Sequence, residues 1–315
     1  MNQEQWKRQY KTLCEEGKIN SLFQQPWWLD ATGEWNVSLA FRNNQLVGAM
    51  PFAIGRKWGI HYIGMPSFTH HLQIWMDKPP GISPQKWLTR EKQIIWSLIE
   101  NLPRFGFFSM VFTENSFDNW LPFHWKGFRQ EVRYTFTISQ MDTASLDQQM
   151  NRNLKRNIRA GNDIHIAQLD DSHEFYKQCQ ATYKRQQMKM PYTFEAFRKI
   201  DGAVTLHDAG IKLGAYTSDK KLLAVSYLLW DSQRAYYLLA GDNDAGRSEG
   251  ASILLCREAL RIAFEEKKVT EFDFCGSMLE PITEMRRQFG AKSVPLMKIF
   301  KARYRWLDIL YQLTH

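Results

Sequence analysis

The stretch GRSEGASILLCREAL, residues 246–260, places two glycines, a serine, an arginine and a glutamate just before a long apolar-periodic run. The run predicts a helix over 250–267, which follows a strand near 234–240 and a loop rich in Gly and Asp. A helix N-terminus exposes four unpaired backbone N–H groups, and glycines let an anion approach them closely. With Arg247 three residues before Gly250, the stretch is suited to hold a pyrophosphate or another phosphate group.

The same residues also fit a plain capped helix that holds no ligand. Ser248 is a good N-cap residue, and Ala251 and Ser252 are ordinary residues of a first helical turn. The residues of the stretch leave both interpretations open.

Composition predicts a folded protein of two domains. The chain has 315 residues, above the ~250–300 at which single cores stop growing. Its 44% hydrophobic and 23% charged residues are typical of a soluble globular protein. The polar N-terminus and the lack of any apolar run near ~18 residues predict no transmembrane segment and a cytoplasmic location. The four cysteines have no C-x-x-C spacing, so we expect reduced thiols.

The net charge of +8 is shared by the two halves of the chain. Residues 1–138 hold 15 Lys and Arg against 11 Asp and Glu, and residues 139–315 hold 26 against 22. A positive field of this kind favours polyanionic partners such as phosphate-rich cofactors or RNA.

The order of predicted elements occurs twice, which predicts an α/β fold (α+β, mixed sheet) of two similar domains, 1–145 and 146–315, each with its own sheet. The polar stretch 139–150 would contain the boundary between them. In the second half we expect helices at 172–188, 193–200, 250–267 and 281–289, and strands at 203–217, 221–230, 234–240, 270–275 and 293–301. In the first half we expect two strands over 36–54 about the turn Asn43-Asn44, a helix at 89–102 and a strand at 107–112.

Two motifs carry a resemblance to a known family. Arg247-Ser248-Glu249-Gly250-Ala251-Ser252 is similar to the donor loop Gln/Arg-x-x-Gly-x-Gly/Ala of the GNAT (N-acetyltransferase) superfamily. The segment FDFCGSMLEPITEMRRQFG, residues 272–290, resembles the Phe-Asp-Phe-x-Gly-Ser segment and Phe-Gly corner of its tandem-domain branch, which contains the Fem peptidoglycan-bridge aminoacyltransferases. The resemblance covers essentially the whole chain, most specifically 234–300.

The resemblance implies two tandem GNAT-like domains, with the donor held by the second. Acyl-CoA is the expected donor substrate, with aminoacyl-tRNA as the other option, and no metal is expected. The donor would lie between splayed strands at 236–240 and 271–275, with Tyr237 beside the substrate, and an amine of a small molecule or cell-wall precursor would attack its carbonyl. The implied donor-binding residues are Arg247, Ser248, Gly250, Ala251 and Ser252.

The expected catalytic residues are Asp273, Glu280 and Arg286. The two carboxylates are near the implied gap and suit proton transfer, although capping or a surface ion pair would use them equally well. The chain departs from the family in two ways. It has no tyrosine over 282–289, and it has Met285-Arg286 at the position where the members that use aminoacyl-tRNA have Phe-Lys. Arg286 can stabilise an oxyanion or a phosphate but cannot act as a base at neutral pH.

A basic stripe opens the second half. Arg152, Lys155, Arg156 and Arg159 share one face of a predicted helix, which suits tRNA or an anionic acceptor, or simply a solvated helix face. Ten of the twelve tryptophans lie within 6–125, where they pack a core or line an acceptor groove. A non-catalytic RNA- or glycan-binding protein with the same tandem fold is therefore the alternative to an acyltransferase.

Overall fold

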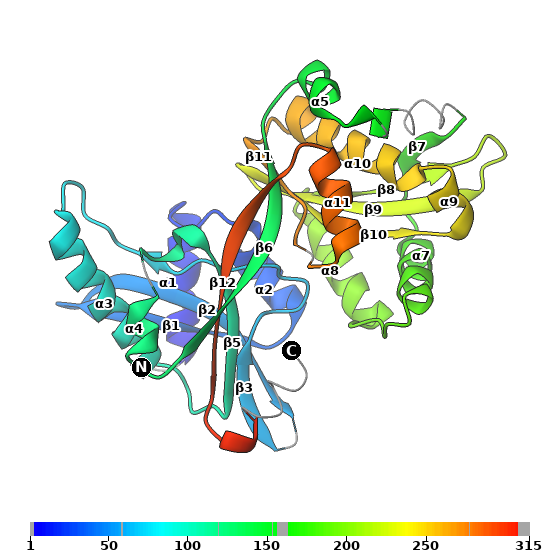
Figure 1. Cartoon of the computed structure of the whole chain (residues 1–315). Coiled ribbons are helices and arrows are strands. Elements are labelled where there is room, and N and C mark those ends of the chain that lie inside the picture. The colour runs from blue at the N-terminus through cyan, green and yellow to red at the C-terminus, as the bar shows by residue number, and fades with distance from the viewer. Residues whose placement is uncertain are drawn as a thin grey trace. The chain divides into compact units, whose positions relative to one another are not determined.

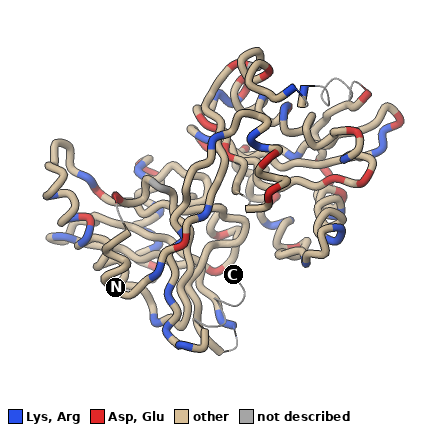
Figure 2. The backbone as a smooth tube through the Cα atoms, in the orientation of Figure 1, with Lys and Arg blue, Asp and Glu red and all other residues tan. Residues whose placement is uncertain are grey.

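A computed structural model of the chain describes residues 3–57, 59–118, 120–152, 154–155, 163–276 and 278–307 (Figure 1). The Cα positions form two compact units. Unit 1 comprises Met1–Arg133 and Pro295–His315, and unit 2 comprises Tyr134–Val294. Lys, Arg, Asp and Glu are spread over both units (Figure 2). Within the described ranges, no helix is both long enough and apolar enough to cross a membrane.

Unit 1 has a mixed sheet in the order β1-β2-β3-β5-β12, with β4 paired to β2. Asn43 and Asn44 close the β1–β2 hairpin with φ of 49° and 61°, so the turn expected there is confirmed. The elements are α1 Gln3–Glu15, a 3-10 turn Leu22–Gln24, α2 Pro26–Thr32, β1 Trp35–Arg42, β2 Gln45–Lys57, β3 Ile60–Gly64, β4 Trp75–Met76, α3 Pro84–Glu100, β5 Phe107–Thr113, a 3-10 turn Glu114–Ser116, α4 Leu121–His124 and most of β12 Lys292–Ala302.

Unit 2 has the strand order β6-β11-β10-β9-β8-β7, in which only β10 and β11 are parallel. The amphipathic helix α10 buries its apolar face on one side of this sheet, and α7 and α8 cover the other (Figure 1). The elements are β6 Arg129–Ser139, α5 Thr143–Gln149, β7 His165–Gln168, α7 Ser172–Arg185, α8 Phe194–Leu206, β8 Gly210–Tyr216, β9 Leu222–Trp230, β10 Arg234–Asp242, α9 Asp244–Ser248, α10 Ala251–Arg261, a π-helical turn Ile262–Glu266, β11 Glu271–Asp273 and α11 Glu280–Gln288.

The expectation of a separate sheet in each half is wrong, because two strands belong to both units. β6 begins in unit 1, is a neighbour of β12, and continues into unit 2, where it pairs with β11. β12 begins in unit 2 and ends in unit 1. Residues 134–145 belong to unit 2, and residues 295–315 belong to unit 1. The domain ranges 1–145 and 146–315 expected from the sequence stay a prediction.

The polar stretch 139–150, where the domain boundary is expected, contains α5, whose N-cap Asp142 accepts a hydrogen bond from the Ser145 N–H at 2.6 Å. Only two residues of this short segment, Leu146 and Met150, are buried in the core of unit 2, which is too few to show a period. The strand expected over 203–217 begins only at Gly210, because α8 continues to Leu206.

Leu146→Ala tests whether α5 is part of the core. Leu146 is 1% exposed, and emptying such a site costs about 2–5 kcal/mol of unfolding free energy. The exposed neighbour Gln148→Ala is the control and should change it by less than about 0.5 kcal/mol. Urea unfolding followed by circular dichroism measures both variants, and equal midpoints would contradict the assignment of α5 to the core.

Candidate active site

Strands β10 and β11 part at the centre of unit 2. They pair in parallel only from Arg234↔Glu271 to Tyr236↔Asp273, after which β10 continues to Asp242 and β11 ends. The register of β10 with β9 also shifts between Tyr237 and Leu239. This bulge takes the backbone of the residue between them out of the ladder, beside the point where the strands part.

The N-terminus of α10 is open to an anion. Its N-cap residue Gly250 has φ of 75°, a left-handed conformation that glycine adopts without strain, and no side chain caps the helix. The first-turn N–H groups, which include those of Ala251 and Ser252, therefore have no side-chain acceptor at the cap. Ser248 instead ends α9 and donates to the Ala245 carbonyl at 2.9 Å, so the interpretation of Ser248 as the cap of this helix is wrong.

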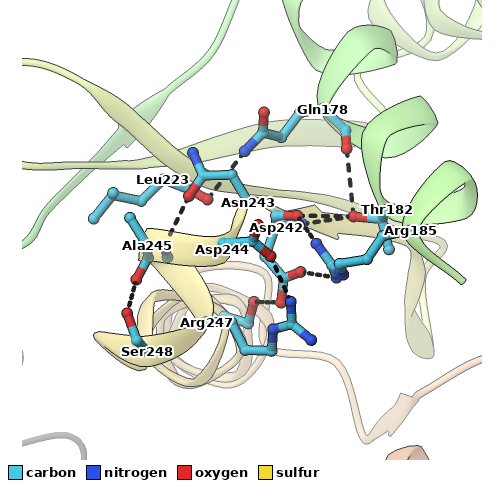
Figure 3. Close-up of polar contacts among 12 residues, drawn as sticks. Gln178, Thr182, Arg185, Leu223, Asp242, Asn243, Asp244, Ala245, Arg247 and Ser248 are labelled. Atoms are coloured by element: carbon cyan, nitrogen blue, oxygen red, sulfur yellow. Dashed lines mark hydrogen bonds and ion pairs between the residues drawn. The ribbon is translucent and has the colours of Figure 1, made fainter.

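Helix α9 is pressed against the start of β9 (Figure 3). A Cβ at Gly246 would lie 2.3 Å from the Leu223 carbonyl oxygen, so this position tolerates only glycine. Asn243 caps α9 by accepting from the Gly246 N–H at 2.8 Å, and its own N–H donates to the Leu223 carbonyl at 3.0 Å. Gln178 donates to the same carbonyl at 3.0 Å. This close packing fixes the backbone that leads into Gly250.

Asp242 joins α7, β10 and α10 (Figure 3). Its carboxylate forms an ion pair with Arg185 and accepts a hydrogen bond from the Ser252 hydroxyl at 3.0 Å. Arg185 also donates to the Asp242 carbonyl at 2.7 Å, and Thr182 bonds the same backbone. The side chain of Ser252 is thus occupied by a carboxylate. Arg185 and Thr182 were missed from the sequence because they lie on a helix almost 60 residues earlier.

Arg247 forms an ion pair with Asp244, with Nη2 and Oδ1 2.7 Å apart. The two side chains are 54% and 88% exposed, and an ion pair this exposed contributes at most about 1 kcal/mol. Exchange of Asp244 for a phosphate group would therefore cost little.

Arg286 is a cation inside the apolar core of unit 2. It is 7% exposed, and its guanidinium carbon lies 5.7 Å and 5.6 Å from the ring centroids of Phe136 and Phe274. Nη2 donates to the carbonyls of Phe274 and Gly276 at 2.8 and 3.0 Å. Nε and Nη1 are buried and have no hydrogen-bond partner among the described residues. Burial lowers the pKa of this guanidinium, which nevertheless stays charged at neutral pH.

Asp273 is fully buried at the turn that follows β11. Its Oδ1 accepts from the Thr135 hydroxyl and from the Cys275 N–H, the latter at 2.7 Å, and Oδ2 lies 3.8 Å from Arg234 Nη1. Thr135 in turn accepts from the Gly276 N–H at 3.0 Å. Asp273 and Arg286 therefore hold the same turn from two directions.

The other predicted residues lie in different environments. Glu280 begins α11 and is exposed, so its catalytic role stays a prediction. Tyr237 is 7% exposed and packs on Phe274, and burial raises the pKa of its hydroxyl. Burial likewise raises the pKa of the Cys256 and Cys275 thiols, so neither is a thiolate at neutral pH.

The basic stripe is described only in part. Lys155 Nζ donates to the Gln148 carbonyl at 3.3 Å, and Arg152 is exposed. Arg156 and Arg159 lie outside the described residues. Anion binding by this stripe stays a prediction.

The geometry of unit 2, in which β10 and β11 separate beside the uncapped N-terminus of α10, agrees with a comparison with known protein families. Residues 145–280 match the family model of the acetyltransferase (GNAT) domain. The match places a GNAT domain at residues 145–280. No curated protein sequence matches the chain. The family prediction is thus confirmed for this half.

Solved structures extend the GNAT fold to the whole chain. It is similar to FemX, with a TM-score of 0.66, 11% identity and 97% of both chains covered. It is also similar to a tandem GNAT protein from the clavulanic acid biosynthesis pathway, with a TM-score of 0.54 and 8% identity over 95% of this chain and 94% of the other. The C-terminal domain of a putative lysylphosphatidylglycerol synthetase from Agrobacterium fabrum has a TM-score of 0.53 and 10% identity over 99% of this chain and 96% of the other. Two tandem GNAT-like domains, the predicted fold class, are confirmed.

Gly246→Ala tests the packing that supports the donor-loop backbone. The added methyl group meets the Leu223 carbonyl, which is backbone and cannot move aside, so we expect a loss of about 1–3 kcal/mol of unfolding free energy. Gly202→Ala on α8 is the control, because a Cβ there meets nothing within 4 Å; it should be neutral or stabilising. Thermal unfolding compares the two, and an unchanged melting temperature in Gly246→Ala would contradict the close approach.

Proposed function

We propose that the protein is an N-acyltransferase that moves an acyl group from acyl-CoA to an amine acceptor. The observation that carries this proposal is the parting of β10 from β11 beside the uncapped N-terminus of α10. If the thioester of an acyl-CoA lay between β10 and β11, the pyrophosphate of its CoA portion would lie at the N-terminus of α10. GNAT membership of residues 145–280 supports acyl transfer as the reaction class.

The donor pyrophosphate would be bound by backbone N–H groups after Gly250 and by the guanidinium of Arg247. Anions are stabilised at helix N-termini by these unpaired N–H groups and by the helix dipole. Gly250 adds no side chain that would block the approach. Ser252 would position the loop through Asp242, since its hydroxyl already donates to that carboxylate.

Arg286 would stabilise the charge that develops on the thioester carbonyl oxygen. Its Nε and Nη1 groups have no hydrogen-bond partner among the described residues. They lie in an apolar environment, where a preorganised donor is most effective. The amine nitrogen forms a bond to the carbonyl carbon, the carbon–sulfur bond breaks, and the CoA sulfur leaves with the proton lost by the amine. Asp273 would position the turn that Arg286 holds, because its Oδ1 already accepts from Thr135 and from the Cys275 N–H. Its Oδ2 is buried without a hydrogen-bond partner among the described residues and lies 3.8 Å from Arg234 Nη1.

Aminoacyl-tRNA is the second candidate donor, and an amine of a cell-wall precursor is a candidate acceptor. The resemblance of residues 272–290 to the Fem aminoacyltransferases suggests both, and the fold shared with FemX supports that resemblance. The family members that use aminoacyl-tRNA have a lysine at the position of Arg286. This arginine therefore favours acyl-CoA as the donor.

Arg247→Ala tests the donor site by calorimetric titration with acetyl-CoA, free CoA and aminoacyl-tRNA. Loss of a charge-assisted hydrogen bond worth ~1.5–3 kcal/mol should weaken donor binding roughly 10- to 100-fold with unchanged folding. Gly250→Val should also block it. The control is Arg287→Ala, because Arg287 has the same i,i+3 ion pair, to Glu284 at 2.9 Å, and similar exposure. Wild-type affinity in Arg247→Ala would remove the donor-loop assignment, and tRNA binding without CoA binding would favour the RNA-binding alternative.

Arg286→Met tests the role at the carbonyl. Removing one preorganised donor typically costs about 10²–10³ in kcat, so we expect that loss with little change in acetyl-CoA affinity. Thiol release from acetyl-CoA in the presence of a panel of amines measures the rate. Arg286→Lys keeps the charge and should restore part of the rate. A lower melting temperature with an unchanged rate per folded molecule would show that Arg286 only holds the turn.

A further inference from the structure

An amphipathic surface lies on unit 1, outside the GNAT site. It consists of Leu88, Lys92 and Trp96 on α3, and of Leu121, Trp125 and Lys126 on α4 and the turn that follows it; we call it the α3–α4 surface. Leu88, Lys92 and Trp96 are spaced four residues apart and so share one helix face. Trp125, Leu88 and Leu121 are 56%, 44% and 42% exposed.

The surface is rigid because each helix is anchored beneath it. Trp96 Nε1 donates to the Pro122 carbonyl at 3.0 Å, and the ring of Trp96 meets that of Trp125 edge to face at 6.4 Å. The opposite face of α3 is buried in the core through Ile94, Ile95 and Leu98, as Phe123 is from α4. The apolar side chains therefore stay exposed in the folded unit.

Basic groups surround the apolar ones. Lys92 Nζ lies 5.2 Å from the ring centroid of Trp96 and 6.0 Å from that of Trp125, and Lys126 Nζ lies 4.8 Å from Trp96. Lys86 is exposed on the same helix, but it lies two residues before Leu88 and so on another face; Figure 2 shows the basic positions along α3. Of the carboxylates on α3, Glu91 is buried, and Glu100 forms an ion pair with Lys126 at 2.7 Å that offsets the charges of both groups.

We propose that the α3–α4 surface binds the interface of a membrane rich in anionic phospholipid. Trp and Leu side chains partition into the boundary between headgroups and acyl chains, while lysines contact lipid phosphates. The protein would thus lie on a membrane without spanning it.

The arrangement of the residues favours this occupant over two others. Nucleic-acid bases stack on open aromatic faces, but two lysine ammonium groups lie over the ring of Trp96, and Leu88 and Leu121 offer a base no polar contact. A symmetric second copy would bring the same lysines against one another, because a two-fold interface pairs each patch with itself. An anionic lipid surface satisfies the apolar and the basic groups together.

Vesicle flotation of the full chain tests the proposal. We expect the protein to bind phosphatidylglycerol vesicles at low salt, to bind more weakly as salt rises, and to bind little to phosphatidylcholine vesicles. Trp125→Ala should reduce binding about tenfold, because it removes the most exposed apolar side chain of the surface. Lys92→Glu should reduce binding about tenfold as well, since each charge near such a surface changes affinity severalfold.

Two variants on α8 of unit 2 are matched controls. Leu206→Ser removes an exposed leucine and Lys199→Glu reverses an exposed lysine, and both should bind vesicles as the wild type does. Circular dichroism checks that all four variants are folded. The proposal is overturned if the wild type does not bind anionic vesicles, or if the α3–α4 and control variants bind equally. It is also overturned if Trp125→Ala and Lys92→Glu leave vesicle binding unchanged and instead abolish tRNA binding or self-association in size-exclusion chromatography.

Discussion

The buried guanidinium of Arg286 is the constraint around which the GNAT half is built. A charge in an apolar core is costly unless it is paired, and here two backbone carbonyls, those of Phe274 and Gly276, satisfy part of it. Those carbonyls can reach Arg286 only because the chain turns sharply after β11, with φ of 55° at Cys275 and 64° at Gly276. The turn ends the pairing of β11 with β10. The same cation therefore holds the turn at which this pairing ends, and its Nε and Nη1 donors have no hydrogen-bond partner among the described residues.

Local signals in the sequence predicted much of the fold. Asn43-Asn44 closes a hairpin, Thr193 caps α8 by accepting from the Ala196 N–H at 3.2 Å, and the apolar period after Gly250 forms α10. Each of these depends on residues within one or two turns of one another, which is the range over which propensity and periodicity act. The repeated order of these elements predicted two similar domains, and the family resemblance then identified both as GNAT-like.

What the sequence did not predict depends on contacts distant along the chain. Strand β6 serves both units because β12 and β11, more than 130 residues later, supply its neighbours. Arg185 reaches Asp242 from 57 residues away. The burial of Arg286 was also hidden, because it lies in a polar helix whose composition suggests a solvated face, and only the carbonyls of the turn explain its place inside.

The two carboxylates beside the donor loop act differently on a bound phosphate. The charge of Asp242 is offset by its ion pair with Arg185, its carboxylate also accepts a hydrogen bond from Ser252, and its side chain is only 18% exposed. Its field on a phosphate is therefore small, and the pair with Arg185 has no reason to open. Asp244 is 88% exposed and paired with Arg247 alone, so a phosphate competes with it for one guanidinium at a cost of at most about 1 kcal/mol. In the proposed donor site the phosphate and Asp244 would therefore share one arginine, and the backbone N–H groups after Gly250 would supply the rest of the phosphate contacts.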